Sequence, residues 1–133
     1  MERASYSPDS LSGAYVVVVD TDKERRALVA GILRYCGALV TPVETPDDAD
    51  AVLSILRPDV VVVDFSRPHE AAIAFVARIR AMRLEDGAKV PTIAIADGDA
   101  DGALARARRF DAVLTRPLEA WALCQAVADL LPS

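Results

Sequence analysis

The chain has 133 residues, which suits a single domain with one hydrophobic core. Hydrophobic residues make up 53% of the sequence, aromatic residues only 5%, and the formal net charge is −5. An acidic domain lacks the basic surface that binds nucleic acid or anionic lipid, so we expect neither as a direct partner. No apolar run approaches the roughly 20 residues of a membrane span. The polar N-terminus lacks the apolar core of a signal peptide, and we predict a cytoplasmic location without membrane contact.

The N-terminal third of the chain begins with a polar stretch and continues into a strand and a helix. Residues 1–13 are rich in Ser and predict a flexible tail, followed by a domain over 14–133. A valine-rich strand is expected over 14–20. Asp22 then suits the N-cap of a helix whose apolar positions recur at helical spacing, and Gly37 suits its end.

The rest of the chain continues the same alternation. The expected elements are, in order, a strand over 38–43, a helix capped by Thr45, a valine strand ending at Asp64, a helix over 69–84 ended by Gly87, a strand over 90–96, a helix running through Arg109, a strand over 112–115 and a helix over 118–131. Five strands that alternate with five helices predict the α/β class. The expected architecture is a doubly wound, five-stranded parallel sheet flanked by five helices, with right-handed crossovers.

Acidic residues end two of the valine runs. Continuous valine runs are typical of parallel strands buried on both faces, and Asp20 and Asp64 each end such a run. Because the carboxyl ends of parallel strands meet at one edge, the two carboxylates are expected near each other, on strands about 4.8 Å apart. Such a pair repels unless a proton or a cation intervenes, and carboxylate oxygens suit Mg²⁺. A solvated loop aspartate is the alternative interpretation of either residue.

Further short motifs complete a recognisable pattern. Pro68 follows Asp64 closely, a Val90-Pro91 pair opens the fourth strand, and Arg116-Pro117 follows the fifth. In this order, the motifs resemble the receiver domain of two-component response regulators over residues 14–131. The resemblance implies a flavodoxin-like fold and a signal-transduction function in a phosphorelay rather than enzyme activity.

The resemblance also implies a role for each matching residue. Asp64 corresponds to the aspartate that accepts a phosphoryl group from a histidine kinase or phosphotransfer protein. Asp20 and Asp64 correspond to magnesium ligands, and Ser66 to the residue that binds the ion through its backbone carbonyl. Arg116 stands where the family has a lysine; it keeps the charge and can fork onto phosphate. The peptide bond before Pro117 is expected to be cis.

Several positions depart from the family pattern. Thr21 replaces the second acid of the first strand end, and Asp22 either reaches a metal ion through water or merely caps the helix. Ala96 replaces the switch Ser or Thr, and Val113 replaces the usual aromatic residue. These departures predict weak magnesium binding. They also keep open an alternative function, a pseudo-receiver that acts as a phosphorylation-independent protein-interaction module.

The expected partners follow from the same resemblance. A histidine kinase or phosphotransfer protein would act on Asp64, and a downstream protein would bind the face formed by the fourth helix, the fifth strand and the last helix. A second copy of the chain is a further candidate partner. A nucleotide- or flavin-binding protein of similar topology is a third class, but no Gly-rich phosphate loop follows the first strand.

Three remaining features favour ordinary structural roles. Cys36 and Cys124 lack metal-type spacing and are expected as buried free thiols. The acidic loop 97–102 matches the start of an EF-hand, but Arg108 stands where the loop needs a bidentate Glu. An acidic turn before a helix explains that loop better. His69, the only histidine, is expected as a solvated residue at a helix start.

Overall fold

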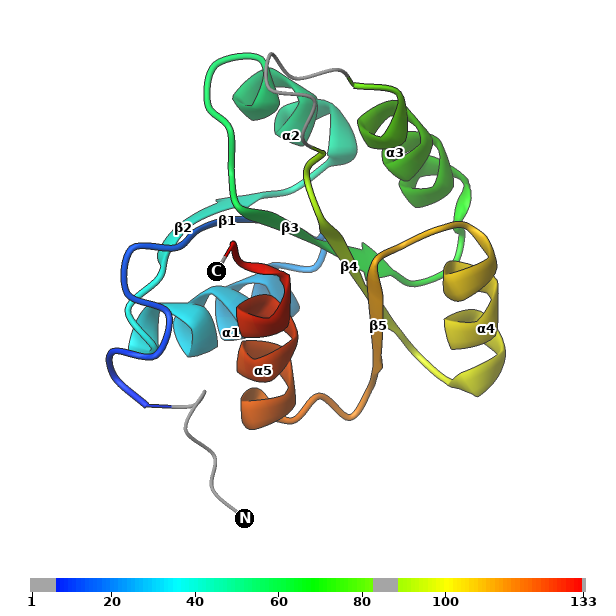
Figure 1. The fold of residues 1–133 in the computed structure, drawn as a ribbon. Helices are drawn as coiled ribbons and strands as arrows, with labels where there is room; N and C mark the ends of the chain where they lie inside the picture. The colour runs from blue at the N-terminus through cyan, green and yellow to red at the C-terminus, as the bar shows by residue number, and fades with distance from the viewer. Residues whose placement is uncertain (1–6, 83–88, 133) are drawn as a thin grey trace.

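The computed structural model describes residues 7–82 and 89–132. Its five strands form one parallel sheet in the order β2-β1-β3-β4-β5, which confirms the predicted α/β architecture (Figure 1). The elements are β1 (Tyr15–Val19), α1 (Lys23–Tyr35), β2 (Leu39–Val43), α2 (Pro46–Leu53), β3 (Val60–Phe65), α3 (Glu70–Ala81), β4 (Thr92–Ala96), α4 (Asp99–Ala107), β5 (Ala112–Thr115) and α5 (Ala120–Leu130).

Helices cover both faces of the sheet. Figure 1 shows α1 and α5 together on one face and α2, α3 and α4 on the other. The valine runs supply both faces, because successive side chains of a strand point to opposite sides. Val16 and Val18 pack toward α1 and α5, whereas Val17 and Val19 pack toward the opposite helices. The central strands β1 and β3 are therefore buried on both sides, which fixes the positions of their carboxyl ends.

The described part of the N-terminal stretch packs against the domain. Residues 7–13 form turns, and Leu11 is only 1% exposed within the core shared with α1 and α5. The Leu11 amide donates to the Cys36 carbonyl at 2.8 Å. The predicted flexible tail therefore does not describe residues 7–13, because the apolar Leu11 side chain finds a buried place beside the end of α1. Residues 1–6 lie outside the described part.

The two cysteines meet between α1 and α5. Both are free and fully buried, and their Sγ atoms lie 3.0 Å apart. Burial, together with the neighbouring Cys36, raises the pKa of the Cys124 thiol far above its ordinary value. The prediction of buried free thiols is confirmed.

Several element ends differ from their expected positions. Strand β4 begins at Thr92 and α5 at Ala120, each two residues later than predicted. Helix α4 ends at Ala107 because Arg109 adopts a left-handed backbone conformation, with a φ of 74°. Helix α3 spans Glu70–Ala81, and its expected stop at Gly87 lies outside the described residues.

Two loops at the carboxyl edge contain cis peptide bonds. The Arg116–Pro117 bond is cis, as the resemblance implied, and the Arg67–Pro68 bond is also cis. Within residues 7–82 and 89–132, no helix has the length and apolar character needed to cross a membrane.

Candidate functional site

The carboxyl edge of the sheet brings the two strand-end acids together. Val19 pairs with Val63, so the next residues, Asp20 and Asp64, lie on neighbouring strands at the same level. Their side chains are 4% and 12% exposed, respectively. Both line a cleft of about 650 Å³ above the strand ends. The predicted acid pair is therefore present, and it is largely withdrawn from bulk solvent.

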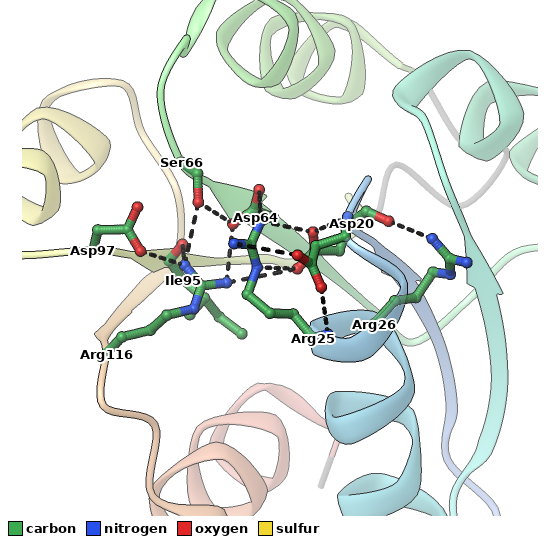
Figure 2. A network of polar contacts seen from close by, with 9 residues as sticks. Asp20, Arg25, Arg26, Asp64, Ser66, Ile95, Asp97 and Arg116 are labelled. Carbon is green, nitrogen blue, oxygen red and sulfur yellow. Dashed lines mark hydrogen bonds and ion pairs between the residues drawn. The ribbon is translucent and has the colours of Figure 1, made fainter.

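An arginine from α1 lies between the two carboxylates (Figure 2). The Arg25 Nε donates to Asp20 Oδ2 at 3.1 Å, and its Nη2 donates to Asp20 Oδ1 at 3.1 Å. The same Nη2 also donates to Asp64 Oδ2 at 3.3 Å. The hydrogen bonds and the charge of Asp20, with further attraction from Asp64, raise the pKa of Arg25. The guanidinium thus binds both acids at once.

A second arginine reaches the acids from the loop after β5. The Arg116 Nη2 donates to Asp64 Oδ1 at 2.9 Å and lies 3.6 Å from Asp20 Oδ2. Its Nη1 donates to Asp97 Oδ1 at 2.9 Å, so Arg116 links the ends of three strands (Figure 2). Burial favours a higher pKa for Asp97, but hydrogen bonds from Arg116 and Ser66 outweigh it and lower that pKa.

The two remaining predicted site residues, Ser66 and Asp22, differ in whether they contact Asp64. The Ser66 hydroxyl donates to Asp64 Oδ1 at 2.7 Å, so Ser66 belongs to the network. Asp22 instead caps α1, because its Oδ1 accepts from the Arg25 backbone N at 2.9 Å. That backbone hydrogen bond is the main cause of the lowered pKa of Asp22. Of the two interpretations of Asp22, the structure shows the helix cap.

Magnesium does not fit the donor set in this arrangement. Asp20 Oδ1 already accepts from the Asp22 amide at 2.8 Å as well as from Arg25, and Asp64 Oδ1 accepts from both Ser66 and Arg116. Both carboxylates already pair with guanidinium groups, and Arg116 is shared with a third carboxylate, that of Asp97. The described residues contain no group of three or more His, Cys, Asp or Glu side chains able to hold a metal ion.

Thr21, Ala96 and Val113 are the positions that depart from the pattern of the resembled family. Thr21 is exposed and lines the cleft. Ala96, at the end of β4, is fully buried beside Phe65 of β3 and Thr115 of β5, its register partners. Val113 is half-buried on β5. A methyl group at Ala96 has no donor to offer to a group bound at Asp64.

His69 differs from its prediction as a solvated residue. Its ring stacks on Phe65, with centroids 4.2 Å apart and planes 9° apart. Its Nε2 lies 3.2 Å from Asp101 Oδ1, and its buried Nδ1 has no hydrogen-bond partner among the described residues. The Asp101 carboxylate also accepts from Arg67 at 3.4 Å. The side chain is only 13% exposed, because the aromatic ring and the acid of α4 hold it against the domain.

Sequence reasoning missed two members of the network, Arg25 and Asp97. Arg25 carried a usable signal, since a long cationic side chain in the first turn of α1 leans back toward the helix N-terminus. That terminus lies at the carboxyl edge of the sheet, where Asp20 stands. Asp97 also carried a signal, because it directly follows β4.

Comparisons with known proteins identify the fold. No family model matches the chain, and no curated protein sequence matches it either. Among solved structures, the chain is similar to the receiver domain of a signal-transduction histidine kinase from Syntrophus aciditrophicus. The TM-score is 0.77 at 21% identity, over 90% of both chains.

Other solved structures give the same result. The chemotaxis response regulator CheY4 of Vibrio cholerae has a TM-score of 0.72 at 22% identity, over 89% of this chain and 98% of its own. A response regulator receiver protein from Burkholderia phymatum has a TM-score of 0.73 at 28% identity, over 88% and 94%. The chain therefore has the fold of a response-regulator receiver domain, which confirms the resemblance at the level of the fold.

Proposed function

We propose that this chain is a receiver-fold signalling module that binds a partner protein without a phosphorylation cycle, that is, a pseudo-receiver. The observation that carries the proposal is the engagement of Asp64. Its Oδ1 accepts hydrogen bonds from Ser66 and Arg116, and its Oδ2 accepts one from Arg25. Hydrogen bonds from two guanidinium groups lower the nucleophilicity of the Asp64 carboxylate. The side chain is also mostly buried, which limits access to it.

The absent hydroxyl at Ala96 supports the same proposal. A phosphoryl group can shift a conformational equilibrium only through contacts that differ between the two states. A hydrogen bond to a charged group contributes roughly 1.5–3 kcal/mol. Without that contact, phosphorylation of Asp64 would change the equilibrium constant between the two states by a factor at least about ten times smaller. The partner surface would be the face of α4, β5 and α5, whose edge strand β5 is half-buried along its length.

A phosphoryl acceptor is the second candidate function, favoured by the position of Arg116. In this function an Asp64 oxygen attacks the phosphorus of a phosphohistidine on the partner, and the phosphorus–nitrogen bond breaks as the imidazole leaves. The Arg116 guanidinium, 2.9 Å from Asp64 Oδ1, balances the charge of the transferred group. Arg25 would have to release Asp64 Oδ2 before the attack. A histidine kinase or phosphotransfer protein would be the donor.

Labelling with acetyl phosphate separates the two functions. Wild-type protein and Asp64→Asn are incubated with acetyl phosphate, with and without magnesium chloride, and their intact masses are compared. The pseudo-receiver predicts that wild type gains no phosphoryl mass beyond that of Asp64→Asn under either condition. A stoichiometric gain in wild type that Asp64→Asn lacks would instead establish the phosphoryl acceptor.

A further inference from the structure

The Arg25 side chain has the geometry of a bound cation rather than of a surface ion pair. It starts in the first turn of α1, where the Arg25 backbone N is fixed by the Asp22 cap. Its fork takes both oxygens of Asp20, and one of its nitrogens also bridges to Asp64 Oδ2 (Figure 2). Asp20 is 4% exposed, so this pair is shielded from solvent on the acid's side.

The two central carboxylates have cationic partners without any ion from solution. Asp20 and Asp64 carry two negative charges, and Arg25 and Arg116 supply two positive ones within 3.6 Å of them. Two carboxylates this close would repel each other if either guanidinium were removed. A divalent cation bound between them would instead meet the guanidinium of Arg25 at short range. Arg25 and such an ion therefore compete for one position.

We propose that the Arg25 guanidinium is the resident cation of this site: it occupies the position between Asp20 and Asp64 and keeps divalent metal ions out. A metal ion must break the three Arg25 hydrogen bonds before it reaches the carboxylates. Thr21 offers no carboxylate to compensate for that loss. Because Arg25 is part of the chain, the two carboxylates keep a positively charged partner when no metal ion is present.

The inference deepens the proposed pseudo-receiver function and makes a separate claim. In this proposal Arg25, more than the missing carboxylate at Thr21, is the barrier that keeps the metal out. Removal of Arg25 therefore creates a divalent-cation site from Asp20 and Asp64. Arg26 is the matched control, because its Nη1 donates at 2.9 Å to the Asp20 backbone carbonyl and not to the carboxylate.

The test measures Mn²⁺ binding, by calorimetry and by water-proton relaxation, to wild type, Arg25→Met and Arg26→Met. We expect Arg25→Met to bind Mn²⁺ at least about tenfold more tightly than wild type, since the ion no longer displaces a charged hydrogen-bond donor. Arg26→Met should match wild type. Sodium chloride of equal ionic strength controls for screening of the acids.

The inference is overturned if Arg25→Met binds Mn²⁺ no more tightly than wild type, whether both proteins bind the ion or neither does. Arg25→Gln, which keeps neutral donors on a similar stem, replaces Arg25→Met if the latter does not fold. A wild type whose Asp20 and Asp64 amide resonances shift at about 1 mM Mg²⁺ overturns the inference without any variant.

The outcomes for this inference and for the proposed function are distinguishable. A wild type that binds Mn²⁺ as tightly as Arg25→Met, yet stays unlabelled by acetyl phosphate, overturns the resident cation alone. A wild type that is labelled on Asp64 without metal overturns the pseudo-receiver alone.

Discussion

Aspartates stand at both edges of the sheet, but their partners differ in kind. At the amino edge, Asp59 accepts from the Tyr15 backbone N at 2.8 Å, and Asp111 accepts from the Thr92 backbone N at 2.7 Å. Each ties the start of one strand to the neighbouring strand. These donors belong to the backbone of the sheet, so they cannot leave while the sheet is intact.

At the carboxyl edge, the donors are mainly side chains. Asp64 is held by Arg25, Arg116 and Ser66, and Asp20 mainly by Arg25. A side chain can rotate away without unfolding anything, so these contacts can be exchanged for a ligand. A strand-end aspartate is therefore structural or functional according to its partner, and the sequence does not show that partner directly.

The largest expected effect is at the amino edge. Asp111→Ala should lower the free energy of unfolding by about 2–3 kcal/mol, because it strands the amide of the fully buried Thr92 and removes the ion pair with Arg80, whose guanidinium lies 2.8 Å from the acid. Urea denaturation measures the loss. Asp111→Asn keeps an acceptor and is the control. A loss under about 0.5 kcal/mol for Asp111→Ala would contradict a structural role for this aspartate.

An effect of intermediate size is expected when a hydroxyl is restored at residue 96, at the carboxyl edge. Ala96→Thr should destabilise the protein by about 1–2 kcal/mol, since it adds volume at a fully buried position. Ala96→Val adds a similar volume without a hydroxyl and controls for packing. If Asp64 accepts beryllofluoride, the chemical shifts over α4, β5 and α5 should respond more strongly in Ala96→Thr than in wild type or Ala96→Val. Equal responses in all three would show that the hydroxyl is not needed.

A smaller effect compares the same substitution at the two edges. Asp64→Asn should cost about 1 kcal/mol and should reduce the dependence of stability on salt, because it removes one charge from a network of three carboxylates and two guanidinium groups. Asp59→Asn keeps a side-chain acceptor for the Tyr15 backbone N at the opposite edge and should leave the salt dependence of wild type nearly unchanged. Denaturation midpoints in low and high salt measure both. Equal responses of the two variants to salt would contradict this expectation.

The smallest effect concerns pH at the rim of the network. The folded pKa of Asp97 lies below its ordinary value of 3.8, so its stabilising contribution is present above that value and disappears as the pH falls through the folded pKa. The side chain is 49% exposed, which limits the contribution to a few tenths of a kcal/mol. Asp97→Asn should therefore be slightly less stable than wild type near neutral pH and equal to it in acid. A difference that grows in acid would contradict this sign.

Much of the fold could be predicted because its signals are local. The valine runs, the Thr45 cap and the Asp22 cap act within a few residues, and each is present as expected. Leu11 and His69 could not be placed in this way. The Leu11 side chain packs into the core beside α1 and α5, and its backbone N donates to the Cys36 carbonyl. The His69 side chain contacts Asp101 from α4.

For the candidate site, the two valine runs were enough to predict that Asp20 and Asp64 share one edge, because parallel strands in register align their carboxyl ends. The identity of the cation between them depends on long-range contacts. The contact from Arg25 to Asp64 joins residues 39 positions apart, and the Arg116 contact joins residues 52 apart. Such contacts depend on how α1 and the loop after β5 pack over the strand ends. No periodicity in the sequence encodes that packing, because it arises from the sum of contacts across the two faces of the sheet.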